Sequence, residues 1–381
     1  MSSSFKRHSL IIFAFTTFTL FLSGSINYSD TQYSNSDLNK YITMAEASPG
    51  LDTDVIRPFV YRIVAPWVAG LLPFSTSTNF YFLNFLALLA LSYSFYLFLI
   101  EFGVDEKLSL VMTILFQLNK YFFLFLAWNH FQLSDTLSLA LLFYFFILLK
   151  RRKFKMLFLL MILGVLIKEY SLMIIPAGFI YLYKDHYEKS SLIYYSIISV
   201  LSVLVFILIR VVIVSEGGES LFTQYTTQVI YYSKPELLAK RFIIPFTPFG
   251  LLPIIFLKDL IIFFREHKYF FIYALTIIIL SFFGEPERLI EPLAAVYYLF
   301  VAIIIKQYVL KKSDDVIKNK IVLTLVGISF LASFYHLWGI ITLPSELYSI
   351  ISTILFTIIT SAIFYFSKRS MKNNNDFRAV Q

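Results

Sequence analysis

The chain has 381 residues, of which 58% are hydrophobic and only 15% are charged, whereas roughly a quarter of the residues in a water-soluble globular protein are charged. The absence of cysteine excludes disulfides, thiol nucleophiles and Cys-ligated metals. The net charge of +8 does not indicate nucleic-acid binding, because Lys and Arg gather in short clusters at the edges of apolar stretches, as in membrane proteins. These stretches are continuous rather than alternating, which predicts an all-α, polytopic transmembrane helical bundle.

The N-terminal segment predicts a first membrane span. Lys6 and Arg7 precede an apolar run without a convincing cleavage site after it, so we expect an uncleaved span over residues 9–26 with a cytoplasmic N-terminus. A first outer loop over residues 27–78 follows. Its segment Arg57–Pro73 combines Arg with several Pro residues, which disfavours a spanning helix and predicts a short helix at the outer interface.

The rest of the chain alternates apolar stretches with short polar segments, so residues 1–381 are expected to form a single transmembrane domain. Core spans are expected over residues 79–214, a second outer loop over 215–241, C-terminal spans over 242–367 and a cytoplasmic tail over 368–381. After the first span, the individual spans are expected at about Asn79–Glu101, Leu108–Ala127, Thr136–Leu149, Met156–Ile167, Leu172–Tyr183, Leu192–Val214, Phe242–Phe264, Tyr269–Phe283, Leu289–Ile305, Ile321–Gly339 and Leu347–Phe366.

Two of these stretches, Met156–Ile167 and Leu172–Tyr183, are short for full crossings and could instead form one kinked span. A merged span would place the basic segment Lys306–Lys320 and the tail outside the cell, against the positive-inside rule. The charge distribution therefore favours about twelve crossings, with the N-terminus and the basic turns in the cytoplasm.

With this topology, acidic and basic side chains mix in very short segments at the outer ends of the spans. A charge near hydrocarbon costs about 2.5–3.5 kcal/mol on insertion scales, so such residues usually face an interior cavity and have partners. The inner ends carry runs of Lys and Arg, which topology alone explains. This asymmetry predicts an active or binding site on the extracytoplasmic side.

The first outer loop carries the candidate general base. Asp37 in SDLNKYITMAEA follows the first span, and an ionised carboxylate there can take a proton from a hydroxyl. Asp30 and Asp54 compete for this role, and each of the three can equally be a solvated loop acid. Arg57 and Arg62 present forks of donors that match phosphate geometry, although contact with lipid head groups would explain them equally well.

Two further segments add candidates from the core spans. WNHFQLSD contains His130 and Asp135, and Asp135 either serves the site or simply caps the following helix. His130 predicts no metal site, because no second His lies at ligand spacing. Lys168 and Glu169 interrupt the apolar sequence GVLIKEYSLMIIP, where they either pair with other helices or contact an anionic substrate.

The segment GEPERLIEP holds the last candidates, Glu285 and Arg288. Arg288 is the best candidate for a cation that binds phosphate in the outer leaflet, and the alternative is pairing with its neighbouring acids. No metal-ligating residues are predicted, although Glu285 and Glu287 leave a divalent cation open as a cofactor. Walker, dinucleotide-binding, HExxH and nucleophile-elbow sequences are all missing, which argues against a cytoplasmic nucleotide site.

These segments resemble the GT-C superfamily of membrane glycosyltransferases, which use polyprenyl-phosphate sugars. SDLNKYITMA followed by RPFVYRIVAPWVAG is similar to the acidic first outer loop and interfacial helix of that family. The run from Ser134 to Tyr183 is similar to its core, with Asp135 as the second outer-loop acid and Lys168-Glu169 as the charged pair. GEPERLIEP is similar to the later outer segment, so Arg288 carries over as a lipid-phosphate contact. The spread of acids along the first loop departs from the family's adjacent acid pair.

The resemblance implies an integral membrane glycosyltransferase that moves a hexosyl or pentosyl group from a polyprenyl-phosphate sugar donor to a glycan, lipid or protein acceptor at the extracytoplasmic face. It implies a multi-pass protein of the bacterial inner membrane, in contact with membrane lipids. Two other functions remain open from the residues alone. One is a transporter or flippase of a lipid-linked or anionic solute, and the other is a non-catalytic membrane assembly subunit.

Overall fold

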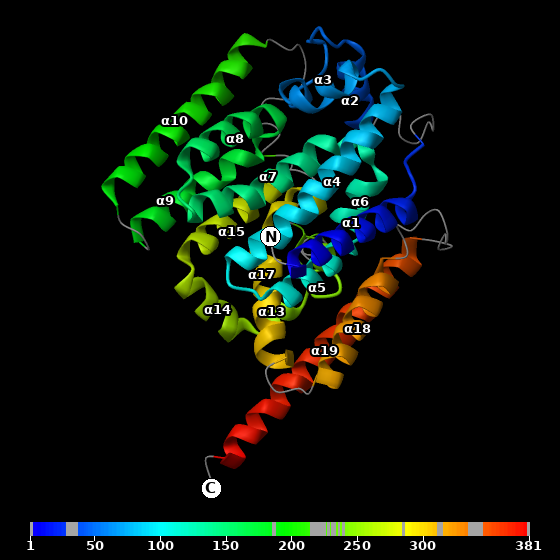
Figure 1. Cartoon of the computed structure of the whole chain (residues 1–381), viewed down its shortest axis with the longest axis vertical. Coiled ribbons are helices and arrows are strands. Elements are labelled where there is room, and N and C mark those ends of the chain that lie inside the picture. The colour runs from blue at the N-terminus through cyan, green and yellow to red at the C-terminus, as the bar shows by residue number, and fades with distance from the viewer. Residues whose placement is uncertain are drawn as a thin grey trace.

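The structure is a computed structural model that describes residues 3–27, 37–184, 188–213, 241–283, 286–310, 315–333 and 346–378, with isolated residues between 214 and 240. Throughout this described part the regular structure is helical and contains no strand, which confirms the all-α prediction (Figure 1). The predicted second outer loop, residues 215–241, lies almost wholly outside the described residues.

The helices follow one another in a bundle of long and short elements. In chain order they are α1 (Ser3–Ser23), α2 (Asp37–Glu46), η2 (Phe59–Tyr61), α3 (Val64–Leu71), α4 (Thr76–Glu101), α5 (Glu106–Gln117), α6 (Phe123–Trp128), η3 (His130–Gln132), α7 (Leu133–Lys150), α8 (Phe154–Ile167), η4 (Glu169–Met173), α9 (Ile174–Lys184), α10 (Lys189–Val212), η5 (Ile244–Phe246), α13 (Leu252–Ile255), α14 (Leu257–Glu266), α15 (Lys268–Leu280), η6 (Ser281–Phe283), α16 (Pro286–Leu289), η7 (Glu291–Leu293), α17 (Ala294–Ile304), η8 (Ile305–Leu310), α18 (Asp315–Ala332) and α19 (Glu346–Arg378).

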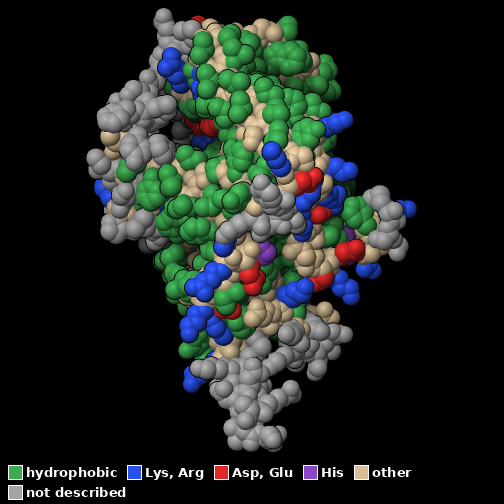
Figure 2. Space-filling view, turned by 90° about the vertical axis from the view of Figure 1, so that its left-hand side faces the viewer, with side chains coloured by type: hydrophobic (Ala, Val, Ile, Leu, Met, Phe, Trp, Pro, Cys, Tyr) green, Lys and Arg blue, Asp and Glu red, His purple; other side chains and the backbone are tan. Residues whose placement is uncertain are grey.

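Among the described residues, 5 helical segments are long and apolar enough to cross a membrane. They are Ser4–Ser23, Thr76–Glu101, His130–Lys150, Lys189–Val212 and Glu291–Leu310. Shorter apolar helices accompany them at Phe154–Ile167, Lys268–Leu280 and Asn319–Ala332. Broad hydrophobic areas cover the face drawn in Figure 2, and Lys and Arg side chains gather in groups near Asp and Glu. This surface is compatible with a membrane protein, because hydrocarbon can cover apolar side chains that water would not.

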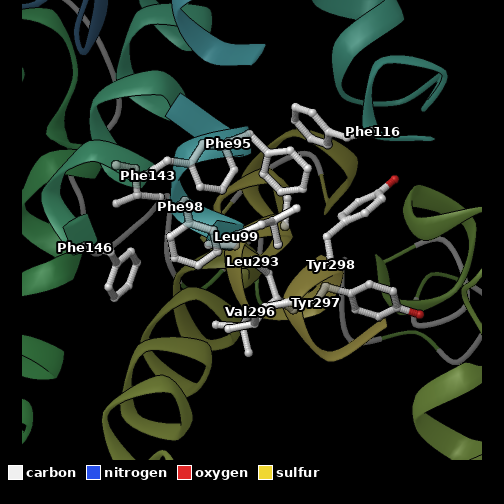
Figure 3. Close-up of a cluster of buried hydrophobic side chains, with 14 of the residues drawn as sticks. Phe95, Phe98, Leu99, Phe116, Phe143, Phe146, Leu293, Val296, Tyr297 and Tyr298 are labelled. Carbon is white, nitrogen blue, oxygen red and sulfur yellow. The ribbon is translucent and has the colours of Figure 1, made fainter. Parts of the chain in front are cut away.

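An aromatic cluster joins the central helices (Figure 3). Phe95 of α4 lies 4.6 Å from Phe116 of α5 and 5.1 Å from Phe143 of α7, measured between ring centroids. Tyr298 of α17 meets Phe95 and Phe116 edge to face, at 5.7 and 5.4 Å. Such ring pairs add about 0.5–1.5 kcal/mol each to the burial of their apolar area. The cluster therefore fixes α7 relative to α17, and the first turns of these two helices adjoin the candidate site.

The predicted interfacial helix over Arg57–Pro73 is shorter than expected. The structure instead has the single turn η2 followed by the eight-residue α3. Pro66 lies in the first turn of α3, where a backbone N–H has no partner within the helix, so the helix can begin just before this proline. α3 packs directly against α2, and the two lie together at the top of Figure 1.

The predicted span Leu108–Ala127 is not one continuous helix, because the chain breaks between α5 and α6. The Asn119 side chain occupies the break. Its Oδ1 accepts hydrogen bonds from the backbone N–H groups of Tyr121 and Phe122, at 3.0 and 2.8 Å, and its Nδ2 donates to the Pro245 carbonyl at 2.8 Å. These bonds replace helical ones inside the protein, which is the condition for broken backbone at membrane depth. The neighbouring Lys120 donates to the buried Thr353 hydroxyl at 2.6 Å.

The predicted span Phe242–Phe264, whose entry contains several prolines, is not one continuous helix. The structure divides it into η5, α13 and α14. Pro245 and Pro253 each lie at the start of a helical element, because proline lacks the N–H that a helix interior requires. Two smaller differences lie at the ends of the chain, where α1 covers Ser3–Ser23 instead of residues 9–26 and α19 continues to Arg378, into the predicted tail.

Two polar ends define the bundle. α7 carries Asp135 in its first turn and Lys150 in its last, so the two ends are separated by the length of this helix, about 27 Å. The basic end, defined by Lys150–Lys155, is held by ion pairs of Arg151 with Glu101 and of Arg152 with Glu188, at 2.6 and 2.5 Å. The candidate residues from the sequence lie toward the opposite end.

Candidate functional site

Asp135 lies at the inner wall of the site. It is in the first turn of α7, where the helix dipole favours a carboxylate. The side chain is only 3% exposed, and it forms an ion pair with Lys168, which is equally buried. Its other oxygen, Oδ2, lies 3.2 Å from Arg288 Nη2. Asp135 is therefore not the cap of α7, whose N-cap residue is Gln132, but joins two cations from different parts of the chain.

Arg288 connects the elements around the site. Its Nη1 donates to Asp37 Oδ2 at 2.5 Å, and its Nη2 donates to Gln132 Oε1 at 3.0 Å and to Asp135 Oδ2 at 3.2 Å. These partners come from α2 and from the consecutive elements η3 and α7, and α2 is far in sequence from the other two. One guanidinium thus brings together Asp37 of α2 and Asp135 of α7.

Lys168 reaches the site from a break between α8 and η4. Its backbone is extended, with φ −167° and ψ 145°, which ends α8 and turns the side chain toward Asp135. The ammonium also lies 3.9 Å from the centroid of the Tyr170 ring. Gly164 lies directly against Ser171 in this region, and a Cβ at Gly164 would be 2.7 Å from the Ser171 Cβ. This close packing of η4 on α8 fixes the short turn between them, which carries Lys168 and Glu169.

A second ion pair lies beside the first. Arg62, between η2 and α3, donates to both oxygens of Glu169, at 2.6 and 3.4 Å, and to the Tyr41 hydroxyl at 3.0 Å. Burial raises the pKa of Glu169, but the charge and hydrogen bonds of Arg62 outweigh it and bring the pKa down to about 2. Glu169 is therefore ionised at neutral pH and held by a two-point contact.

Asp37 is ionised as well. Burial raises the pKa of its carboxyl, while the charge of Arg288, the hydrogen bond from Arg288 and the charge of Lys40 lower it, and the net result is a pKa below the ordinary value. Lys40, one helical turn along α2, lies 3.5 Å from Asp37 Oδ1. Asp37 thus sits between two cations.

We call the linked residues the outer network: Lys40, Asp37, Arg288, Asp135, Lys168, Arg62 and Glu169. Its residues form two layers. Asp135 and Lys168 are nearly inaccessible, whereas Asp37, Arg288 and Lys40 are 21%, 23% and 25% exposed. The exposed layer can meet a ligand, and the buried layer holds it in position.

Three residues near the network were not among the site residues predicted from the sequence, although Glu291 belongs to the charged segment GEPERLIEP that was noted there. Gln132 and Tyr41 bind the two arginines directly. Glu291 is 2% exposed, and its Oε1 has no hydrogen-bond partner among the described residues. The recognisable signal for Glu291 was its place in GEPERLIEP, three residues after Arg288. Nothing in the local sequence distinguishes Gln132 or Tyr41 from ordinary helix residues.

Other sequence candidates are placed elsewhere. Asp54 and Arg57 are exposed, and the Asp52 carboxylate closes a turn by accepting the Asp54 N–H at 2.8 Å. His130 is buried beside Ser77, 3.2 Å from its hydroxyl, and packs edge to face on Tyr81. It therefore contacts α4 rather than the outer network. Asp30 and Glu285 lie outside the described residues.

Within the described ranges, no group of three or more His, Asp or Glu side chains is arranged to hold a metal ion. No protein-family model matches the chain, and no curated protein matches it either. The function is therefore inferred from the geometry of the outer network and from the sequence resemblance.

Proposed function

We propose that the protein is an integral membrane glycosyltransferase of the GT-C type, in a bundle of about twelve crossings of the bacterial inner membrane. It transfers a hexosyl or pentosyl group from a polyprenyl-phosphate donor to a glycan, lipid or protein acceptor at the extracytoplasmic face. The observation that carries the proposal is the contact of one partly exposed guanidinium, Arg288, with Asp37 and Asp135. This contact supports the proposal, because a guanidinium, which is suited to binding phosphate, lies next to an ionised carboxylate.

In the proposed reaction, the partly exposed residues of the network carry out the chemistry. Asp37 takes the proton from the acceptor hydroxyl, and the oxygen attacks the anomeric carbon of the sugar. The bond from that carbon to the phosphate oxygen breaks, and polyprenyl phosphate leaves with the electron pair. Arg288 and Lys40 stabilise the negative charge that grows on the leaving phosphate. A single displacement of this kind inverts the anomeric configuration.

Binding of the donor would also adjust the base. The donor phosphate competes with Asp37 for the Arg288 guanidinium, so donor binding weakens the interaction that lowers the pKa of Asp37. The pKa then rises toward the ordinary value, and a carboxylate with a higher pKa is a stronger base. Asp37 therefore becomes a stronger base when a donor is bound.

The broken helices bear on the alternative, a transporter or flippase. A transporter commonly uses broken helices near the midplane to bind its solute. Here the Asn119 side chain fills the break. It bonds to the backbone N–H groups of Tyr121 and Phe122, to the Pro245 carbonyl and to the Tyr298 hydroxyl. The polar groups of this break satisfy one another, which supports a structural role for it and favours the outer network as the place of function.

An activity assay tests the proposal directly. Membranes containing the protein are given radiolabelled polyprenyl-phosphate sugars, and transfer to endogenous acceptors is measured. We expect Asp37→Asn to lower transfer about 10²–10⁴-fold, the usual range for a general base, and Arg288→Ala to lower it about 10²–10³-fold.

Asp54→Asn and Arg57→Ala are the matched controls, since these residues are exposed and lie outside the network; both should keep full transfer. Full transfer by Asp37→Asn and Arg288→Ala would remove the assigned roles.

A further inference from the structure

A groove of about 610 Å³ lies at the basic end of the bundle, between the start of α8 and the adjacent face of α10. The cationic part of its lining, here called the mouth, consists of Arg152, Lys153 and Lys155, and the apolar part, here called the floor, includes Met156, Ile197 and Leu201. The groove is therefore lined by both cationic and apolar side chains. It lies at the opposite end of α8 from Lys168, so it is separate from the outer network.

The apolar part of the groove faces outward. Met156 is 46% exposed and Ile197 50% exposed, although both are large hydrophobic side chains. Of the most apolar stretch of 18 residues in α10, only 22% is buried inside the protein. In a membrane these surfaces are covered by acyl chains.

The turn that builds the mouth has an unusual backbone. Arg152 adopts a left-handed conformation with φ 54°, whereas the other described residues with positive φ are glycines, Gly24 and Gly103. Glycine adopts such a conformation without steric cost, and arginine does not. A non-glycine residue in a strained backbone conformation is a candidate for a functional side chain, and Arg152 lines the groove.

The charge at the mouth is positive. Arg151 pairs with Glu101, and Arg152 pairs with Glu188 through side chains that both remain accessible. Lys153 and Lys155 are exposed, and they supply the excess positive charge among the described residues of this turn. An exposed pair such as Arg152–Glu188 contributes little to stability, so a phosphate can compete with Glu188 for the Arg152 guanidinium.

From this combination we infer that the groove binds one anionic phospholipid of the cytoplasmic leaflet. The phosphate contacts Arg152, Lys153 and Lys155, and one acyl chain lies along the apolar floor between α8 and α10. A basic pocket between helices on the cytoplasmic side is the arrangement that recognises anionic head groups. The inference requires membrane insertion with the basic end inside, but it does not require the proposed glycosyl transfer.

Native mass spectrometry of the purified full-length protein in detergent tests this site. Equal amounts of dioleoyl phosphatidylglycerol and dioleoyl phosphatidylcholine are added, and the bound lipid is counted. The wild-type protein should retain one phosphatidylglycerol with a preference of about tenfold. The double variant Lys153→Gln/Lys155→Gln should lose that preference, while the matched variant Lys107→Gln/Lys268→Gln, with two other exposed lysines removed, should keep it.

Arg152→Gly separates lipid binding from folding. This variant relieves the left-handed arginine, so its melting temperature should stay the same or rise, while its preference for phosphatidylglycerol should fall. Equal retention of the two lipids by the wild-type protein would overturn the inference, as would an unchanged preference in Lys153→Gln/Lys155→Gln.

Discussion

Arg62 and Arg57 lie in the same loop, but only Arg62 is enclosed. Its guanidinium binds Glu169 and Tyr41, while Arg57 remains exposed. Removing one partner of a buried ion pair leaves an uncompensated charge, which typically costs about 3–5 kcal/mol. Because Glu169 keeps some contact with solvent, we expect Arg62→Leu to lower the free energy of unfolding by about 2–3 kcal/mol.

Thermal unfolding in detergent measures this difference, with Arg57→Leu as the control expected within about 0.5 kcal/mol of wild type. Equal effects of the two substitutions would show that the Arg62–Glu169 pair does not stabilise the fold.

The same pair predicts a response to acid. Folding lowers the pKa of Glu169 from 4.5 to about 2. A group with a lowered pKa in the folded state adds stability that is fully present above its unfolded pKa and is lost as the pH falls through the folded value. The stability advantage of wild type over Glu169→Gln should therefore shrink as the pH is lowered below 4.5. The melting temperatures of both proteins, measured from neutral pH to below pH 4.5, check this prediction. A difference in melting temperature that stays constant over this range would contradict the lowered pKa of Glu169.

At the residue scale, the sequence predicted part of the site. Topology alone placed Asp37, Asp135 and Arg288 at one end of the bundle, and the structure brings them into contact. The partners of Arg62 and Lys168 were not predictable, because Glu169 and Asp135 approach them only after the helices have packed. Asp54 had the same local appearance as Asp37, and only tertiary structure separates them.

The position of α2 depends on its close approach to α3. A Cβ at Gly70 would lie 1.9 Å from the Ala45 carbonyl oxygen and 2.5 Å from the Ser48 Cβ. α2 would have to move, and Asp37 would move with it. We expect Gly70→Ala to lower transfer activity by at least about tenfold, since small displacements of a positioned group are costly.

Gly327→Ala is the matched control, because nothing lies within 4 Å of a Cβ at that position in α18, and alanine favours a helix. Transfer activity should be unchanged in this variant. Wild-type activity in Gly70→Ala would show that the packing of α2 on α3 does not position Asp37.

At the element scale, hydrophobic runs predicted where helices occur better than where they break. α4 and α7 closely match the expected spans, because each is a continuous apolar run between polar residues. The break between α5 and α6 was missed, since the groups that stabilise it, Pro245 and Tyr298, are remote in sequence from Asn119. Hydropathy reports the preference of a segment for lipid and carries no information about such distant hydrogen bonds.

At the scale of the whole molecule, the account depends on the separation of the two polar ends. The basic end around Lys150–Lys155 is expected in the cytoplasm, and the outer network is expected on the other side. The enzymatic proposal and the lipid site each need this orientation, although they lie at opposite ends of the same helices.

Labelling of single cysteines tests this orientation most directly, because the chain contains no cysteine of its own. Asp54→Cys lies at an exposed position expected outside the membrane on the extracytoplasmic side, and Lys155→Cys and Lys268→Cys lie at exposed positions expected in the cytoplasm. A membrane-impermeant maleimide should label Asp54→Cys in intact cells and should label the other two only after the membrane is opened. Labelling of Asp54→Cys and Lys155→Cys from the same side would contradict the account.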